Sequence, residues 1–233
     1  MRYDTILFDA DGTLLDFHRG ESEAVREALL MSGIEADDEQ IQTYSRINDG
    51  LWKKLERGEI ERSVLLYHRF ELFCEHYGYT SVDAKKIAVD YKQTLSTKAY
   101  LIDGVTQLLD KLYGNVRMYI ITNGVEFIQR GRYARSGIEK YFDGLFISEA
   151  MGIQKPDARY FEYVAQRIEG FDPKRTLVVG DSLTSDIKGG NNYGLDTCWY
   201  SPENGDTSGV ADPTYRAESF DDVYRVICGE VSR

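Results

Sequence analysis

The sequence predicts an α/β fold, a doubly wound Rossmann-like parallel sheet with an inserted α-helical cap domain. A short apolar run at residues 6–8 indicates a buried first strand, and only helical periodicity follows it, from about residue 19 to residue 99. From residue 103 onward strand and helix patterns alternate, which is typical of a parallel sheet covered on both faces. The expected domains are a core of residues 1–16 and 101–233 and a cap of residues 17–100.

The inserted block contains four stretches of apolar residues at helical spacing. They lie at residues 24–29, 41–55, 64–73 and 87–95. Gly33, Gly58 and Gly78 are positioned to end the first three helices. Thr80 is positioned to begin the fourth, with Asp83 placed as in a capping box. Four helices in series predict a small bundle.

The remaining strands and helices of the core follow this block. Strands are predicted at residues 118–122, 145–148, 176–180 and 197–200, and helices at 105–112, 125–136, 158–168, 184–193 and 220–227. The first strand must join the same sheet. The helical block is therefore an insertion after that strand and not a separate N-terminal domain.

Composition argues against several classes of function. The chain has 233 residues and a formal net charge of −11, so the phosphate backbone of a nucleic acid would be repelled. A small phosphorylated substrate is still compatible, because local basic groups and a metal ion can reverse the field. The three cysteines lack ligand spacing, no apolar run approaches the roughly 18 residues of a membrane span, and the first residues lack a signal-peptide pattern. We therefore expect a cytoplasmic protein with no nucleic-acid or membrane partner, and we leave its oligomeric state open.

Polar side chains recur at the carboxyl ends of the predicted strands, or in loops on that side. Asp9 and Asp11 follow the first strand, and Gly12 permits a sharp turn after them. The other polar sites are Thr122-Asn123-Gly124, Lys155-Pro156-Asp157, and Asp181 with Asp186. Ligands of doubly wound sheets bind at this edge. The spacing therefore predicts one shared site.

The residue types at this edge suit phosphoryl chemistry at a metal centre. Two aspartates at the mouth of a buried strand repel each other, and a cation would relieve that cost. A carboxylate nucleophile beside a carboxyl general acid, with Mg²⁺ between enzyme and substrate, fits this arrangement. Thr122 offers a hydroxyl, the Asn123-Gly124 turn offers backbone N–H groups, and Lys155 offers a positive charge. Asp181 adds a hard oxygen ligand of the kind that Mg²⁺ prefers.

Each of these motifs also has a purely structural interpretation. Asn-Gly pairs are common in turns, and Asp157 can cap a helix at the end of a solvated loop. Asp181 and Asp186 can cap or solvate the helix that follows them. The occurrence of all the motifs, in this order and at one edge, favours a functional site.

The motifs together resemble those of haloacid-dehalogenase-superfamily phosphatases that carry a helical cap. Residues 9–14, 121–124, 155–157 and 180–186 resemble the first to fourth motifs of that superfamily, and the resemblance covers essentially the full length. More narrowly, the chain resembles the pyrimidine 5′-nucleotidases that clear noncanonical nucleotides. The segments that carry this second resemblance are residues 120–124, 147–149 and 194–199, and in the cap Asn48, Leu51-Trp52 and Gly58.

The resemblance implies the chemistry of the first motif. Asp9 would attack phosphorus and become an aspartyl phosphate. Asp11 would protonate the leaving oxygen and then activate the water that hydrolyses the intermediate. The Asp9 carboxylate, the Asp11 backbone carbonyl and Asp181 would hold Mg²⁺.

The resemblance also implies how the phosphoryl group is held. Thr122, the Asn123 backbone and Lys155 would bind it. Asp186 would act through water or by orienting its neighbours.

The implied substrate is a small phosphorylated metabolite, a pyrimidine nucleoside monophosphate. Tyr44, Trp52 and Tyr91 of the cap are candidates for contact with the base, although helix-spaced aromatics are more often core. A sugar phosphate, another small metabolite or a phosphomutase reaction is the alternative enzymatic reading. A regulatory or binding protein on the same fold is the non-enzymatic one, and loss of Asp9, Asp11 or Lys155 would indicate it. All three residues are present.

Overall fold

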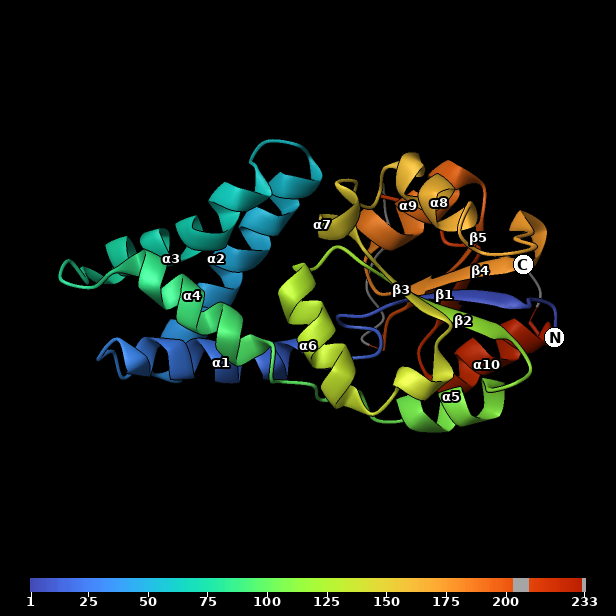
Figure 1. Cartoon of the computed structure of the whole chain (residues 1–233), viewed down its shortest axis with the longest axis horizontal. Coiled ribbons are helices and arrows are strands. Elements are labelled where there is room, and N and C mark those ends of the chain that lie inside the picture. The colour runs from blue at the N-terminus through green and yellow to red at the C-terminus, as the bar shows by residue number, and fades with distance from the viewer. Residues whose placement is uncertain (203–209, 232–233) are drawn as a thin grey trace. The chain divides into compact units, whose positions relative to one another are not determined.

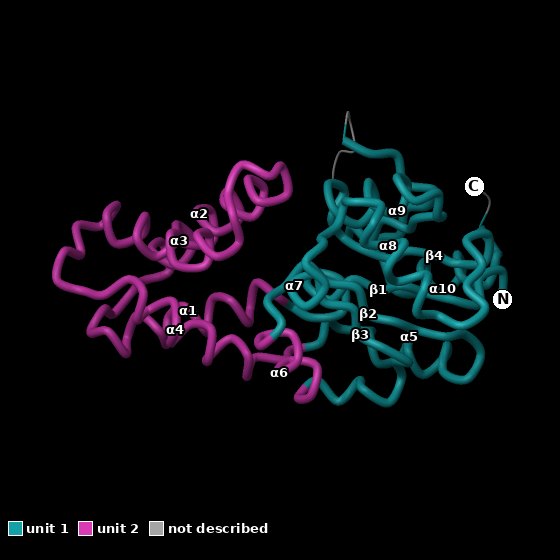
Figure 2. The backbone as a smooth tube through the Cα atoms, turned by 45° about the horizontal axis from the view of Figure 1, so that its top comes forward, with its two compact units in different colours: residues 1–16, 101–126, 136–233 teal, residues 17–100, 127–135 magenta. Residues whose placement is uncertain are grey.

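The computed structural model describes residues 1–202 and 210–231 and divides the chain into two compact units (Figure 2). Unit 1 comprises Met1–Asp16, Leu101–Glu126 and Ser136–Arg233, and unit 2 comprises Phe17–Tyr100 and Phe127–Arg135. The chain crosses between the units at both ends of residues 17–100. It crosses twice more within a single helix, α6 (Glu126–Ser136).

Unit 1 is built on one parallel sheet, which confirms the predicted fold class. The strand order is β3-β2-β1-β4-β5-β6, and every neighbouring pair is parallel. The strands are β1 (Thr5–Asp9), β2 (Arg117–Thr122), β3 (Gly144–Ile147), β4 (Thr176–Gly180), β5 (Asp196–Tyr200) and β6 (Tyr215–Ala217). Strand β6 was not predicted, because three residues are too few to display a period of two.

Helices cover both faces of this sheet (Figure 1). They are α5 (Val105–Leu112), α7 (Ser148–Met151), α8 (Ala158–Ala165), α9 (Lys188–Tyr193) and α10 (Phe220–Cys228). All five residues of β1 are buried at the centre of the sheet, which explains the apolar run of residues 6–8 before Asp9. The helix predicted at residues 184–193 begins as a π-helical turn, Leu183–Ile187, and continues as α9.

Unit 2 contains the four predicted helices of the insertion, which enclose an aromatic core. They are α1 (Phe17–Met31), α2 (Asp38–Glu56), α3 (Arg62–Tyr77) and α4 (Ala84–Leu95). Tyr44, Phe70 and Tyr91 are fully buried. The ring centroids of Tyr44 and Phe70 are 4.9 Å apart, and those of Phe70 and Tyr91 are 5.4 Å apart. Tyr44 and Tyr91 therefore pack in the helical core, and neither presents its ring to a nucleotide base.

The fourth helix begins at Ala84 and not directly after Thr80. Its N-cap is Asp83, whose Oδ1 accepts hydrogen bonds from the amides of Lys85 (2.9 Å) and Lys86 (3.2 Å). The capping box predicted at Thr80 is therefore wrong. Asp83 satisfies the first free amides of the helix directly, which is the function of an N-cap residue.

The middle of α6, residues 127–135, packs within unit 2 and not with the predicted core of residues 1–16 and 101–233. A Cβ atom at Gly131 would lie 2.7 Å from the Ser96 carbonyl oxygen, so the helix backbone directly abuts this segment. Arg132 Nε also donates a hydrogen bond to the Lys98 carbonyl oxygen at 2.9 Å. Helical periodicity predicts that a helix has a buried side, but it does not reveal which neighbour buries it.

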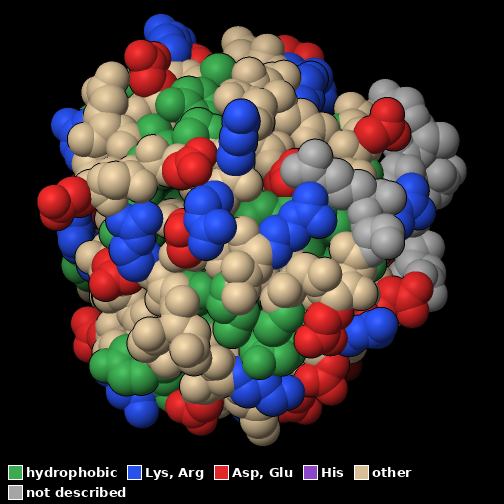
Figure 3. All heavy atoms as spheres, turned by 90° about the vertical axis from the view of Figure 1, so that its right-hand side faces the viewer, with side chains coloured by type: hydrophobic (Ala, Val, Ile, Leu, Met, Phe, Trp, Pro, Cys, Tyr) green, Lys and Arg blue, Asp and Glu red, His purple; other side chains and the backbone are tan. Residues whose placement is uncertain are grey.

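Surface charges of both signs are mixed. On the face drawn in Figure 3, acidic and basic side chains of the described residues are interspersed, and neither sign of charge dominates a large area. No helix within residues 1–202 and 210–231 is both long enough and apolar enough to cross a membrane.

Candidate active site

The carboxyl ends of β1, β2 and β4 meet because these strands are neighbours in the sheet. Asp9 aligns with Ile121 of β2, and Phe8 aligns with Val179 of β4. Thr122 at the end of β2 and Asp181 just beyond β4 therefore flank Asp9. The strand order thus assembles motifs that lie far apart in the sequence.

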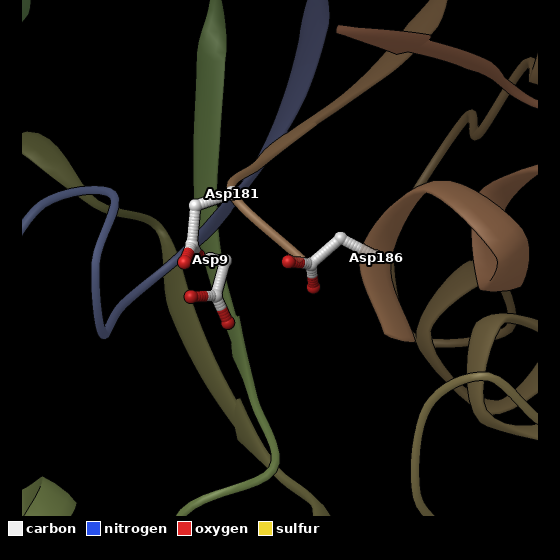
Figure 4. Close-up of side chains that lie close together, drawn as sticks. All are labelled: Asp9, Asp181 and Asp186. Atoms are coloured by element: carbon white, nitrogen blue, oxygen red, sulfur yellow. The ribbon is translucent and has the colours of Figure 1, made fainter. Parts of the chain in front are cut away.

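Three carboxylates gather at this edge. One oxygen from each of Asp9, Asp181 and Asp186 lies within 4.8 Å of the other two. In Figure 4 the carboxyl groups of Asp9 and Asp181 lie close to each other, and that of Asp186 points toward them from the side of the following helix. Asp9 and Asp186 are buried, whereas the Asp181 side chain reaches solvent.

Lys155 places one buried positive charge among these carboxylates. Its Nζ lies 2.6 Å from Asp9 Oδ1 and 2.6 Å from Asp186 Oδ1, and it donates to the Ile121 carbonyl oxygen at 3.1 Å. An ammonium group has three hydrogens, so these contacts satisfy all of its donors. Lys155 is only 1% exposed, and such burial is tolerable only because the charge is fully paired.

These charges shift one another's pKa values. Burial raises the pKa of Asp9, and the charge of Asp186 raises it further, while Lys155 opposes both. The pKa of Asp181 rises to about 7, chiefly because protein atoms crowd this partly solvated carboxyl and then because Asp186 is near. Burial acts to lower the pKa of Lys155, but the charges of Asp186 and Asp9 outweigh it, so this pKa is raised. Carboxylates outnumber the ammonium group, which favours a further cation here.

The loop after β2 holds Lys155 in place. The side chain of Asn123 donates from Nδ2 to the Lys155 carbonyl oxygen (2.8 Å) and accepts from the Lys155 amide at Oδ1 (2.9 Å). The Gly124 amide donates to Thr122 Oγ1 at 3.0 Å, which closes the turn. The Asn123 side chain is thus committed to positioning Lys155, a role that the sequence analysis missed. No local pattern signals it, because the partner lies in a different loop.

Two glycines are required by the close approach of aspartates. Gly12 has a φ of +83°, and a Cβ atom there would lie 2.5 Å from Asp181 Oδ2. A Cβ atom at Gly180 would lie 2.4 Å from Asp186 Cγ. Any side chain at either position would displace one of the carboxylates.

Tyr160 and Trp199 form hydrogen bonds to backbone groups of the site, and the sequence analysis assigned neither role. Tyr160 Oη accepts from the Thr122 amide (3.1 Å) and donates to the Phe146 carbonyl oxygen (2.8 Å). Trp199 Nε1 donates to the backbone carbonyl oxygen of Asp181 at 2.7 Å. A polar aromatic atom in a buried position usually has such a partner, which is the signal that could have indicated both residues.

Asp11 lies beside the carboxylate cluster but is not a member of it. It is half-buried, in a turn closed by a hydrogen bond from the Gly12 amide to the Leu15 carbonyl oxygen at 2.9 Å. The roles predicted for Asp11, as acid, base and source of a backbone metal ligand, remain predictions.

The donor set fits a hard divalent cation such as Mg²⁺. It consists of carboxylate oxygens, which are the ligands that Mg²⁺ prefers. Both oxygens of Asp186 are engaged, Oδ1 with Lys155 and Oδ2 with the Ser182 amide at 3.1 Å. Asp9 and Asp181 are therefore the side chains that best fit a metal ion.

Comparison with known proteins identifies the family. The family model of the haloacid dehalogenase-like hydrolases matches residues 3–194. The chain belongs to this family of hydrolases.

Three relatives match nearly the whole chain. The pyrimidine 5′-nucleotidase PynA of Streptococcus pneumoniae is 40% identical, with 96% of this chain and 94% of that protein covered. The pyrimidine 5′-nucleotidase YjjG of Escherichia coli is 32% identical, with 98% and 99% covered. The HAD hydrolase YfnB of Bacillus subtilis is 38% identical, and its crystal structure matches with a TM-score of 0.92 over 97% of this chain and 99% of that one. That structure is described as bound to magnesium and as revealing interdomain movement.

Proposed function

We propose that this protein is a Mg²⁺-dependent phosphomonoesterase that acts on pyrimidine nucleoside 5′-monophosphates through an aspartyl-phosphate intermediate. The observation that carries the proposal is the buried arrangement of Asp9, Lys155 and Asp186 at the end of β1, with Asp181 beside it. The similarity to PynA and YjjG over nearly the full length supports the class of substrate.

Asp9 is the proposed nucleophile. Lys155 holds its Oδ1 at 2.6 Å, which orients the carboxylate and leaves the second oxygen available for attack. As that oxygen bonds to phosphorus, the bond from phosphorus to the ester oxygen breaks. Asp9 and Asp181 would hold Mg²⁺, which would neutralise negative charge on the phosphoryl oxygens.

Asp11 is the proposed acid and base. It donates a proton to the departing ester oxygen of the nucleoside, which is a poor leaving group without one. It then removes a proton from the water that attacks the aspartyl phosphate. Hydrolysis of this intermediate releases inorganic phosphate and regenerates the Asp9 carboxylate.

Thr122 and the Asn123 amide are the proposed hydrogen-bond contacts to the phosphoryl group. Lys155, whose three donors are already bonded within the protein, is proposed to bind it through its positive charge. Asp186 holds the Lys155 ammonium at 2.6 Å, so this charge is fixed before the substrate arrives. Fixed charges stabilise a transition state better than mobile ones, because they need no reorganisation during the reaction.

Unit 2 is the proposed cap that selects the leaving group and moves during turnover. The interdomain movement described for YfnB supports this role. Within unit 2, Asn48 is fully buried, donating to Glu21 Oε1 (2.7 Å) and accepting from Arg69 Nη1 (2.8 Å). We therefore assign Asn48 to the scaffold of the cap. Trp52, which is half-buried, remains the aromatic candidate for base contact.

Phosphate release from a matched panel of monophosphates tests the proposal. At saturating Mg²⁺ we expect kcat/KM to be highest for deoxyuridine and thymidine monophosphates and lower for purine nucleotides and sugar phosphates. A sugar phosphate turned over far more efficiently would replace the substrate class and leave the phosphomonoesterase in place.

The nucleophile is tested in the same assay. Asp9→Asn should lower kcat by roughly 10⁴-fold or more, the scale seen when a nucleophile is removed. Asp212→Asn, at an exposed position of unit 1, is the matched control and should leave kcat unchanged. Substantial turnover by folded Asp9→Asn would refute the mechanism.

The expected cytoplasmic location and the expected lack of nucleic-acid and membrane partners remain predictions.

A further inference from the structure

Helix α6 belongs to both units. It follows directly on the loop of Thr122, Asn123, Gly124 and Val125. Its first residue, Glu126, belongs to unit 1, and residues 127–135 belong to unit 2. An 11-residue helix is about 16 Å long and moves nearly as a rigid rod.

The unit 2 part of α6 contacts the segments next to both ends of the insertion. Arg132 is fully buried, its Nε donates to the Lys98 carbonyl oxygen at 2.9 Å, and its Cζ lies 5.7 Å from the centroid of the Phe17 ring. Phe17 is the first residue of unit 2, and Lys98 lies two residues before its crossing at Tyr100. One buried guanidinium thus holds both ends of the insertion.

The other end of α6 is tied to the proposed phosphate loop. The Glu126 amide donates to Glu149 Oε2 at 2.7 Å, a favourable position for a carboxylate because the helix N-terminus is partially positive. Immediately before it, Gly124 is bonded to Thr122, and Asn123 holds the backbone of Lys155. A displacement of α6 along its axis would therefore act directly on the residues that position Lys155.

The burial of Arg132 needs a reason beyond packing. Taking a guanidinium out of water is costly, and an apolar side chain of similar volume would usually pack there at no such cost. Arginine differs because one planar group can donate to a carbonyl oxygen and lie over a ring at the same time. These two contacts join segments that are distant in sequence.

We infer that Arg132 is a positioning residue that couples the orientation of unit 2 to the loop of residues 122–125 through α6. This inference rests on the proposed function, in which that loop holds the phosphoryl group and unit 2 moves. When unit 2 closes, α6 moves with the ends of the insertion and sets the loop for catalysis. Loss of the contact leaves a loop that can bind phosphate but no longer responds to closure.

Kinetics of four variants form the first part of the test. Arg132→Met removes the donor and the charge, Arg132→Lys retains both, and Phe17→Leu removes only the ring. Arg135→Met, on an exposed arginine of the same helix bonded to the Gly131 carbonyl oxygen, is the matched control. We expect kcat on a pyrimidine nucleotide to fall by about 3- to 30-fold in Arg132→Met, the scale of measured coupling energies, with KM nearly unchanged. Arg132→Lys should recover part of the loss, and Arg135→Met should show none.

Amide hydrogen exchange with Mg²⁺ and inorganic phosphate forms the second part and needs no turnover. In the wild-type protein, phosphate should slow exchange in residues 122–126 and also in residues 96–100. In Arg132→Met the first response should remain and the second should disappear. If Arg132→Met does not fold, as judged by circular dichroism, Phe17→Leu takes its place, because Arg132 then still donates its hydrogen bond to the Lys98 carbonyl oxygen.

The possible outcomes separate this inference from the proposed function. No response at residues 122–126 in the wild type would overturn the phosphate loop and the inference with it. A response at residues 122–126 without one at 96–100, or an unchanged response at 96–100 in Arg132→Met, would overturn the coupling alone. Where Phe17→Leu takes the place of Arg132→Met, wild-type behaviour in both parts would overturn the coupling.

Discussion

At the scale of single residues, Lys155 determines the charge balance of the site. Its ammonium group is shared between Asp9 and Asp186 at equal distances of 2.6 Å. The side chain is buried, so no water is at hand to replace either contact. The same pairing that stabilises the folded chain also orients the proposed nucleophile. The stability of this site and the proposed catalysis therefore involve the same side chain.

We expect Lys155→Met to destabilise the metal-free protein strongly. Removing one partner of a buried ion pair leaves an uncompensated charge, which typically costs about 3–5 kcal/mol. Urea unfolding in the presence of a chelator measures the free energy of unfolding. Lys174→Met, at an exposed lysine, is the control and should change it little. A Lys155→Met protein as stable as this control would show that the buried pairing contributes nothing.

At the scale of an element, the turn after β1 is shaped by its neighbour after β4. Gly12 adopts a left-handed conformation and passes close to the Asp181 carboxylate, and Thr13 Oγ1 donates to Asp181 Oδ1 at 3.3 Å. The turn therefore packs against one of the proposed metal ligands and helps to orient it. We therefore expect a change in the turn to alter the affinity for the metal ion first.

Gly12→Ala should weaken Mg²⁺ binding by about 10- to 100-fold, the usual effect of disturbing the groups that orient a metal ligand. The added Cβ atom would lie 2.5 Å from Asp181 Oδ2. Gly33→Ala is a closely matched control, because Gly33 has a similar φ of +80° but nothing within 4 Å of the added atom. Both variants carry the same backbone strain, so calorimetric titration with Mg²⁺ isolates the contact. Equal affinities in the two variants would contradict this role of the turn.

The helices of unit 2 are joined by a buried polar network. Glu21 of α1 accepts from Ser45 (2.8 Å) and Asn48 (2.7 Å) of α2, and Asn48 accepts from Arg69 of α3. Burial raises the pKa of Glu21 to about 7, with Asp49 raising it and Ser45, Arg69 and His18 lowering it. A carboxyl group at this position keeps its proton well above its ordinary range.

Glu21 should make the protein less stable as pH rises. In the unfolded chain this carboxyl loses its proton near pH 4.5, whereas the folded chain retains it to about pH 7. The folded state binds more protons between these values, so the contribution of Glu21 is full below pH 4.5 and is lost as pH rises through 7. We expect the stability of the wild type relative to Glu21→Gln to fall by up to about 3 kcal/mol between pH 5 and pH 8.

Denaturant unfolding at several pH values measures this difference. Glu35→Gln, at an exposed glutamate, should show no such trend relative to the wild type. A wild type whose stability changes with pH in parallel with Glu21→Gln would mean that Glu21 ionises normally in the folded protein.

At the scale of the whole molecule, the proposed metal site would also contribute to stability. Asp9, Asp181 and Asp186 come from segments on either side of the insertion, and their mutual repulsion opposes the folded state of unit 1. A cation that binds only the folded chain shifts the equilibrium toward it. Thermal stability therefore reports on metal binding independently of activity.

Mg²⁺ should raise the melting temperature of the chelator-treated protein. At about 100 times the dissociation constant, binding contributes about 2.7 kcal/mol, which corresponds to about 5–10 °C for a chain of this size. Asp181→Asn should lose this shift, whereas Asp212→Asn should retain it. Differential scanning calorimetry with and without Mg²⁺ measures the change. The same upward shift in Asp181→Asn would exclude Asp181 as a ligand.

The sequence by itself determined the fold class, the strands β1 to β5 and the positions of the polar motifs. This was possible because the buried strand β1 contains the apolar run of residues 6–8, and because polar groups interrupt the pattern where strands end. The periods of strands and helices are local properties, readable without knowledge of any neighbour. Strand β6 was not predicted, because three residues give too little local signal. The start of α4 was predicted wrongly, because the sequence offers two possible N-cap residues.

Only the tertiary structure decided which side chains meet. Each of three features depends on groups from different elements. They are the hydrogen bonds between Asn123 and Lys155, the hydrogen bond from Trp199 to Asp181, and the packing that buries Tyr44 and Tyr91. The same holds for α6, whose middle packs in unit 2 although its neighbours in sequence lie in unit 1. Such contacts depend on strand order and helix packing, which are set by the sum of many weak interactions across the chain. No local pattern encodes that sum.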